Sequence, residues 1–236
     1  MNLETIIDDL LDELEVLRFG PPVTHVYNPL DYARASYVQY CQRYAKLSAE
    51  IALIGMNPGP WGMTQTGIPF GEINAVKDWL GISAPIGKPD KMHPKRPVMG
   101  YECTRSEISG KRLWGWAQKA FKTPERFFAR FFIANYCPLQ FIESSGRNRT
   151  PNQLRASERK PLFEACDRAL RRTIEYLNPL YVIGVGRFVQ ERAKIVLSDL
   201  ELTVASITHP SPANPKANKD WDARVTKELT NLGINF

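Results

Sequence analysis

The chain has 236 residues, of which 43% are hydrophobic and 24% charged, and its formal net charge is +6. These values are ordinary for a soluble globular protein with a sizeable core, and no segment approaches the roughly 20 apolar residues that span a bilayer. Residues 1–18 carry a net charge of −5, so the rest of the chain carries +11. A basic body favours a polyanionic partner such as nucleic acid, and a merely basic solvated surface is the alternative.

The first half of the chain predicts two helices, a strand and an irregular segment. Residues 1–17 space their apolar side chains as an amphipathic helix does, and they lack the features of a signal peptide. A second helix is expected over 31–47, with Asp31 as its N-cap. The apolar run 51–56 predicts an interior strand, which a stiff Pro/Gly loop follows. Residues 73–82 indicate a further helix, and 83–110 an irregular surface excursion.

The second half alternates strands with helices. Strands are expected at 130–141, 180–186 and 201–212, and helices at 111–121, 157–177, 187–200 and 219–233, the last with Gly233 as C-cap. Apolar strands that alternate with helices indicate a parallel sheet covered on both faces. We therefore expect an α/β fold in which residues 1–236 form a single domain.

Familiar metal and nucleophile motifs are absent from the sequence. The four cysteines contain no C-x-x-C pair, so buried free thiols are expected rather than an iron–sulfur or zinc site. Walker, G-x-S-x-G and H-E-x-x-H motifs do not occur either. We expect no metal ion and no cofactor.

Polar residues stand where three of the predicted strands end. Asn57 lies in GMNPGP, Asn135 opens NYCPL, and His209 lies in THPSP. The prolines make each strand end a rigid bend. Open α/β sheets bind ligands beyond the carboxyl ends of their strands. We expect the two amides and the imidazole to meet there, in a crevice poor in carboxylates.

This set of groups suits the recognition of a nucleobase and the stabilisation of a leaving anion. An asparagine amide offers one acceptor and two donors, enough to pair with N3–H and O4 of a pyrimidine, and Phe70 supplies a face for stacking. Each residue also has a purely structural alternative. Asn57 can serve as a turn residue, Asn135 as a strand-end cap, His209 as a loop histidine and Phe70 as part of the core.

The motifs GMNPGPWGMTQTGIPFGE, NYCPL, SGRNRTP, GVGR and HPSPANPKANKDW closely resemble those of the single-strand-selective monofunctional uracil-DNA glycosylases. The resemblance covers nearly the whole chain and omits the acidic amino-terminal helix. It implies a three-layer αβα sandwich with a central four-stranded parallel sheet. It also implies excision of uracil, and of 5-oxidised uracils such as 5-hydroxymethyluracil, from DNA without a cut in the backbone.

The same resemblance implies roles for individual residues. Asn57 would position the attacking water, His209 would stabilise the departing uracil at O2, and Asn135 would read N3–H and O4. Further substrate-binding residues are Phe70, Gly59, Met63 and Met56. The DNA-binding residues are those of a wedge that replaces the flipped base, together with nearby basic residues: Pro210, Ser211, Pro212, Ala213, Asn214, Pro215, Lys216, Asn218, Lys219 and Arg187.

One position departs from the family. Ala213 stands where vertebrate relatives have an arginine, and a methyl group does not fill the vacated stack as a guanidinium does. The preference between single- and double-stranded DNA therefore stays open. The expected partner is uracil-containing DNA of either kind, with no membrane. The protein is expected to be a monomer, cytoplasmic and nucleoid-associated in a bacterium or nuclear in a eukaryote.

Three other functions fit the sequence less closely. A non-catalytic uracil- or nucleic-acid-binding module would use the same crevice and release no base. A glycosylase with specificity broadened to xanthine or hypoxanthine would need only small changes in the loop after Asn57. A nucleoside hydrolase would need carboxylates that the strand ends lack.

Overall fold

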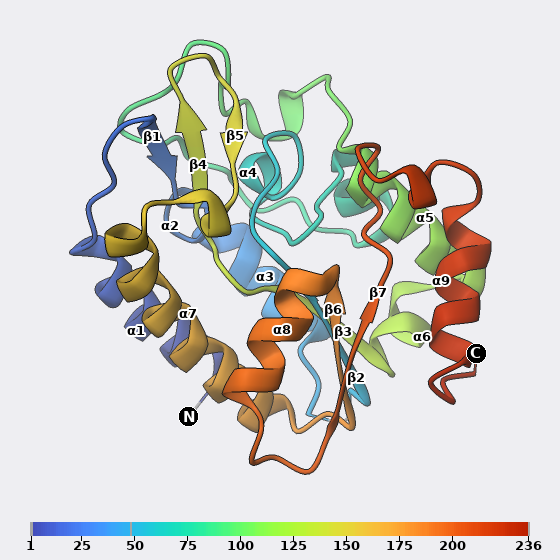
Figure 1. Cartoon of the computed structure of the whole chain (residues 1–236). Coiled ribbons are helices and arrows are strands. Elements are labelled where there is room, and N and C mark those ends of the chain that lie inside the picture. Colours follow the sequence, from blue (N-terminus) through green and yellow to red (C-terminus); the bar gives the residue numbers. More distant parts are fainter. Residues whose placement is uncertain (1, 48, 236) are drawn as a thin grey trace.

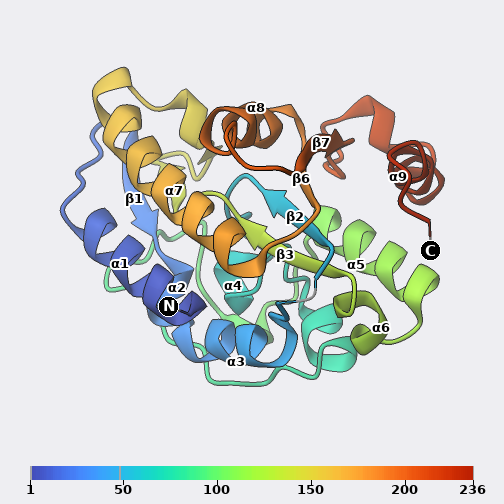
Figure 2. The same ribbon diagram turned by 90° about the horizontal axis from the view of Figure 1, so that it is seen from below.

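The computed structural model describes residues 2–47 and 49–235. Its centre is a sheet of four parallel strands in the order β3-β2-β6-β7: β2 (Ile51–Gly55), β3 (Phe131–Asn135), β6 (Tyr181–Val185) and β7 (Thr203–Ile207) (Figure 1). Helices α7 and α8 cover one face, and α3, α5 and α6 the other (Figure 2). The predicted three-layer αβα sandwich is thus confirmed.

Nine α-helices surround the sheet within the described residues. They are α1 (Leu3–Glu15), α2 (Pro29–Tyr32), α3 (Arg34–Tyr44), α4 (Met63–Thr66), α5 (Ile108–Phe121), α6 (Pro124–Phe128), α7 (Ala156–Leu177), α8 (Arg187–Val196) and α9 (Trp221–Thr230). None of these helices combines the length and the apolar character that crossing a membrane requires. Met1, Ser48 and Phe236 lie outside the described residues, and with them the start of the predicted first helix and the ends of the predicted domain.

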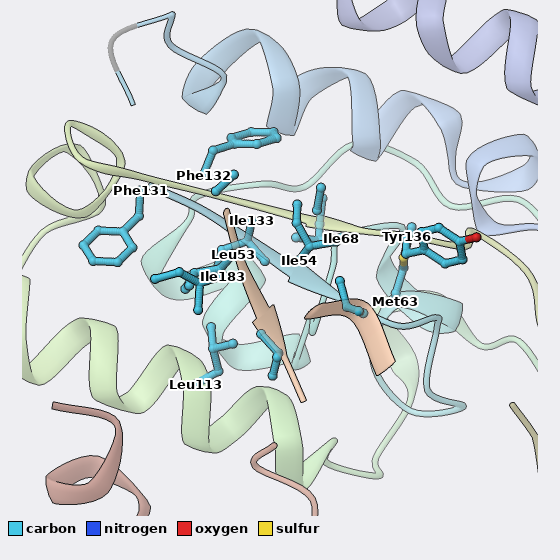
Figure 3. Close-up of a cluster of buried hydrophobic side chains, with 14 of the residues drawn as sticks. Leu53, Ile54, Met63, Ile68, Leu113, Phe131, Phe132, Ile133, Tyr136 and Ile183 are labelled. Atoms are coloured by element: carbon cyan, nitrogen blue, oxygen red, sulfur yellow. The ribbon is translucent and has the colours of Figure 1, made fainter. Parts of the chain in front are cut away.

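The core lies where the sheet meets its helices. All five residues of β2 are buried, as expected for a strand covered on both faces. Figure 3 shows Leu53, Ile133 and Ile183, from three neighbouring strands, gathered beside Leu113 of α5. Met63 stands at one end of this cluster, which therefore continues toward the carboxyl end of β2.

Several predicted elements differ from the structure. The predicted strand 130–141 is two strands, because β4 (Gln140–Glu143) turns away and pairs with β1 (Val23–Tyr27) and β5 (Asn148–Arg149) in a separate antiparallel sheet. The predicted helix 73–82 is shorter than expected, because it runs over 73–79, and its part Ala75–Trp79 is π-helical. Helix α5 begins inside the segment 83–110 that was expected to be irregular, and α6 was not predicted.

The predicted helix 31–47 is also wrong in its start and its continuity. The Asn28 side chain accepts a hydrogen bond from Leu30 N (3.3 Å), so Asn28 rather than Asp31 is the N-cap. The helix is interrupted at Ala33, which separates α2 from α3. At the other end of the chain, α9 stops at Thr230 and its C-cap is Asn231 rather than the predicted Gly233, which follows two residues later with a positive φ of +82°.

The acidic helix α1 packs along α7. Its buried residues Leu3, Ile6, Ile7, Leu10 and Leu14 form one face. Its acids pair with arginines of neighbouring helices: Arg168 with Glu13, Arg172 with Asp9, and Arg34 with Asp8. Partly exposed pairs of this kind contribute about 0–1 kcal/mol each, so apolar burial is the larger contribution to holding α1 in place.

Candidate functional site: a base-sized cavity beyond the sheet

A cavity of about 290 Å³ lies at the carboxyl ends of the central strands. This is the lower end of the ~300–1,000 Å³ range of small-molecule sites, a suitable size for one pyrimidine base. Its lining residues are Met56, Asn57, Pro58, Gly59, Pro60, Met63, Phe70, Glu107, Ser109, Asn135, Asn148, Thr150, His209 and Ser211. The structure therefore brings together every residue predicted as catalytic or substrate-binding.

The ends of β2 and β3 remain hydrogen-bonded past the last residues of the strands. Tyr136 N donates to Gly55 O and Cys137 N donates to Met56 O, both at 2.9 Å. The Asn57 amide nitrogen then donates to Leu139 O at 3.1 Å. Because a carbonyl only accepts, this contact fixes which end of the amide faces the backbone. The amide oxygen of Asn57 has no protein donor within the described part of the chain, so it is free to accept from water.

The Asn135 amide lies at the floor of the cavity. Its nitrogen donates to the Met63 Sδ at 3.1 Å, and a thioether is a weak acceptor that a ligand oxygen can replace. Asn135 pairs in register with Gly55. A Cβ on Gly55 would stand 2.3 Å from the Asn135 Oδ1 and 2.7 Å from the Phe70 ring. Glycine at this position keeps the floor of the cavity open.

Phe70 adopts a backbone conformation that is rare for a bulky residue, with φ of +55°. The turn is held by hydrogen bonds from Gly71 N to Ile68 O (2.8 Å) and from the Trp114 indole to Phe70 O (3.1 Å). Strain of this kind costs about 1–3 kcal/mol and concentrates at binding sites. The ring centroid lies 6.4 Å from that of His209, so both side chains border the same space.

His209 is a neutral imidazole of defined tautomer. It follows β7 by two residues, and burial lowers its pKa to about 4. Ser211 N donates to its Nδ1 at 3.0 Å. A backbone N–H only donates, so Nδ1 carries no proton and Nε2 carries the single N–H of the neutral ring. The imidazole thus offers a hydrogen-bond donor from Nε2 without a positive charge.

The predicted wedge is the loop between β7 and α9. Among the wedge residues 210–218, Ser211 alone lines the cavity, and His209 directly before the wedge lines it as well. Arg112 of α5 holds the loop at both ends, donating to Pro210 O (2.8 Å) and Asn218 Oδ1 (3.1 Å). Asn214 donates to His209 O (3.1 Å). The remaining predicted DNA-binding residues are exposed: Pro212, Ala213, Pro215, Lys216, Asn218, Lys219 and Arg187.

Several residues of the cavity wall were not predicted. Asn148 and Thr150 come from the SGRNRTP motif, to which no role was given, and the Asn148 Oδ1 is buried without a hydrogen-bond partner. Glu107 and Ser109 come from the start of α5. The strand ends themselves carry no carboxylate, and Glu107 is an acid that the sequence analysis did not place in the crevice.

Glu107 is the one acidic side chain among these lining residues. Burial raises the pKa of its carboxyl, and hydrogen bonds from the backbone of Ser109 and Trp61 partly oppose this. Trp61 itself is flanked by two cations, with Arg105 at 4.6 Å and Arg96 at 5.2 Å from its ring centroid. Both are within the range of cation–π contacts.

The cysteines lie outside this site. All four (Cys41, Cys103, Cys137 and Cys166) are buried free thiols. In the part of the chain that the structure describes, no three His, Cys, Asp or Glu side chains gather closely enough to hold a metal ion.

Comparisons with known proteins agree with the geometry. Residues 42–230 match the model of the uracil DNA glycosylase superfamily. The single-strand selective monofunctional uracil DNA glycosylase of Mus musculus is 46% identical over 224 residues, 94% of this chain and 80% of that protein. The Bos taurus protein of the same name is 45% identical over 227 residues, 95% of this chain and 84% of that protein.

A solved structure of SMUG2 from Pedobacter heparinus has the same fold, with a TM-score of 0.65, 17% identity and 97% of each chain covered. The chain belongs to the uracil DNA glycosylase superfamily and, within it, to the family of single-strand selective monofunctional uracil DNA glycosylases.

Proposed function

We propose that this protein removes uracil from DNA by hydrolysing its N-glycosidic bond, and that it leaves an abasic site without cutting the backbone. The observation that carries the proposal is the convergence of Asn57, Asn135, Phe70 and His209 on one base-sized cavity. A base inside a duplex cannot reach this cavity, so the enzyme flips it out or takes it from a single strand.

Base recognition rests on Asn135 and Phe70. Phe70 stacks on the face of the pyrimidine, and the Asn135 amide pairs with N3–H and O4, replacing its weak contact to Met63. Cytosine presents the opposite donor and acceptor pattern, and a mismatched buried amide costs about 1–3 kcal/mol. Thymine keeps this edge and differs only by an apolar methyl group at C5, so its exclusion depends on the surroundings of C5, which we assign to the loop from Gly59 to Met63.

His209 stabilises the leaving base. Cleavage of a glycosidic bond passes through an oxocarbenium-like sugar, and negative charge moves onto uracil. The Nε2–H of the neutral imidazole donates to O2, and this hydrogen bond strengthens as the charge grows. One preorganised donor of this kind contributes about 3–4 kcal/mol, or 10²–10³ in rate.

Asn57 holds the attacking water. An amide takes up no proton near neutral pH, but its free oxygen accepts a hydrogen bond from water and orients it. The mechanism therefore depends more on stabilising the leaving group than on activating the nucleophile.

DNA binding is assigned to the exposed residues of the loop 210–218, in which Pro210 itself is buried, and to the basic residues beside the loop. Lys216, Lys219 and Arg187 are exposed and attract phosphates, an interaction that weakens steeply with salt. Ala213 fills less of the vacated stack than an arginine does, so we expect single-stranded DNA to be the better substrate.

We further propose that a single domain acts as a monomer. Because the proposed substrate is DNA, we also propose that the protein acts on the genome, in the cytoplasm and nucleoid of a bacterium or in a eukaryotic nucleus.

The proposed substrate range includes 5-oxidised uracils such as 5-hydroxymethyluracil. These keep the N3–H and O4 edge that Asn135 reads, and their C5 hydroxyl can hydrogen-bond to the backbone of the loop from Gly59 to Met63, whereas the methyl group of thymine cannot. The second candidate function is a non-catalytic uracil sensor, because the same cavity would bind an extruded base without releasing it.

A labelled single-stranded oligonucleotide with one uracil separates these functions. The proposed enzyme releases free uracil and makes the strand cleavable by alkali. A sensor binds the strand and releases no base, which would refute the proposed function. Cleavage without alkali would indicate lyase activity, which requires an amine nucleophile.

A further inference from the structure

The role of Glu107 is not explained by the mechanism above. It is the only acid among the described cavity-lining residues. A carboxylate near a base that becomes negatively charged opposes the reaction electrostatically, and burying a charged group is costly unless it is hydrogen-bonded. Its presence therefore calls for a function other than direct contact with the leaving base.

The Glu107 side chain fills the space beside two glycines of the loop that follows Asn57. A Cβ on Gly59 would stand 2.6 Å from the Glu107 Oε2 and 3.2 Å from its Cδ. A Cβ on Gly62 would stand 2.9 Å from the Glu107 Cγ and 3.3 Å from its Cβ. At both glycines the three nearest atoms belong to Glu107, so its side chain lies along the loop from end to end.

The Glu107 side chain joins this loop to α5. Its atoms are the nearest ones to Gly59 and to Gly62, on either side of Trp61, and Glu107 is the N-cap of α5, with its carbonyl oxygen accepting a hydrogen bond from Lys111 N (2.8 Å). Helix α5 is in turn fixed to other parts of the site. Trp114 donates to Phe70 O (3.1 Å) and Arg112 to Pro210 O (2.8 Å). The carboxylate thus connects the loop to the same helix that supports the stacking ring and the wedge.

We propose that Glu107 is a positioning residue that fixes the loop from Gly59 to Met63 and thereby sets the room left beside C5 of the base. The inference rests on the proposed function. Met63 closes this loop and accepts the hydrogen bond from Asn135, so a shift of the loop changes both the C5 wall and the base-reading amide. Loss of the carboxylate leaves space behind the loop, which relaxes toward α5 and enlarges the pocket on that side.

The first test compares excision of uracil and thymine from otherwise identical single-stranded oligonucleotides under single-turnover conditions. One methyl group in a pocket discriminates by about 10–200-fold. Glu107→Ala is expected to narrow the uracil-to-thymine rate ratio by about tenfold or more. Glu107→Gln keeps the volume and an acceptor oxygen and is expected to restore the ratio to within about threefold of the parent. Glu102→Ala, at an exposed acid before α5, is the matched control.

The second test is a double-mutant cycle between Gly59 and Glu107. Gly59→Ala places a methyl group against the Glu107 carboxylate in the parent protein. Glu107→Ala removes all three of the atoms that lie nearest to that methyl group. Gly59→Ala is expected to slow uracil excision by about tenfold or more in the parent and by less than about twofold in the Glu107→Ala background. Thermal unfolding provides a readout independent of activity. The midpoint should fall by about 4 °C on Gly59→Ala in the parent and by less than half as much in the Glu107→Ala background.

The outcomes separate the two proposals. Additive effects of the two substitutions on the unfolding midpoint would overturn the role of Glu107 whether or not the protein excises uracil. Equal uracil-to-thymine ratios for Glu107→Ala and Glu102→Ala in an active enzyme would also overturn it and leave the proposed function intact. Failure of the parent protein to release uracil would refute the proposed function alone, because the unfolding cycle still decides the role of Glu107.

Discussion

The charge state of His209 leads to a specific prediction about pH. Burial lowers the pKa of His209 from 6.5 to about 4. At pH 5.5 only about 3% of the imidazole is then protonated, and the Nε2–H donor is present throughout the neutral range. We expect the single-turnover rate of uracil release to show no titration of His209 between pH 8 and 5.5. The rate should fall as the pH approaches 4, because a proton on Nδ1 then faces the Ser211 N–H and removes the hydrogen bond that orients the ring.

The lowered pKa of His209 also makes the stability of the protein depend on pH. Between pH 6.5 and about 4 the unfolded chain binds a proton that the folded protein does not, so the free energy of unfolding falls as the pH is lowered through this window. A displacement of about 2.5 pH units corresponds to about 3 kcal/mol. The free energy of unfolding, measured with urea, should therefore fall between pH 7 and pH 4 by about 3 kcal/mol less in His209→Gln than in the parent protein.

The rate assay uses a single-stranded uracil oligonucleotide quenched at intervals between pH 4.5 and 8. Glu107 is the other group of the cavity with a displaced pKa, raised by burial, so Glu107→Gln is measured in parallel to isolate His209. A rate that declines as the pH rises through 6–7, in both proteins, would show that a charged imidazolium is the donor and would refute the assignment.

Two further substitutions test the floor of the cavity and its DNA-binding surface. Gly55→Ala places a methyl group 2.3 Å from the Asn135 Oδ1, so single-turnover excision should fall by about 100-fold, and unchanged excision would contradict the described floor. Lys216→Ala should lower the slope of log K against log salt for single-stranded DNA by about 0.7, the share of one phosphate, as measured by fluorescence anisotropy. Lys194→Ala, at the far end of α8, is the control, and equal slopes for both variants would remove Lys216 from the DNA contact.

The convergence of the site was predictable from the sequence for a physical reason. Parallel strands present their carboxyl ends at one edge, so polar residues placed there must be neighbours. Asn57, Asn135 and His209 satisfy this rule directly. Phe70 and Met63 lie in the loop that the first of these strand ends begins, and they line the same cavity.

Other features depend on contacts between distant segments and could not be predicted. Strand β1 pairs with β4 although Tyr27 and Gln140 are far apart in the chain, and neither short strand has a strong pattern of its own. Glu107 reaches the cavity because α5 packs beside the loop of Gly59, which composition does not reveal. The tautomer of His209 depends on one backbone N–H, that of Ser211.

Uracil release by two variants tests the account most directly. His209→Leu removes the donor to O2 and should lower the single-turnover rate by about 10²–10³. Asn57→Asp loses the hydrogen bond to Leu139 O but keeps an oxygen that accepts from water, so it should retain measurable activity above that of His209→Leu. Equal losses for the two variants, or release of uracil by His209→Leu at nearly the parent rate, would contradict a mechanism based on stabilising the leaving base.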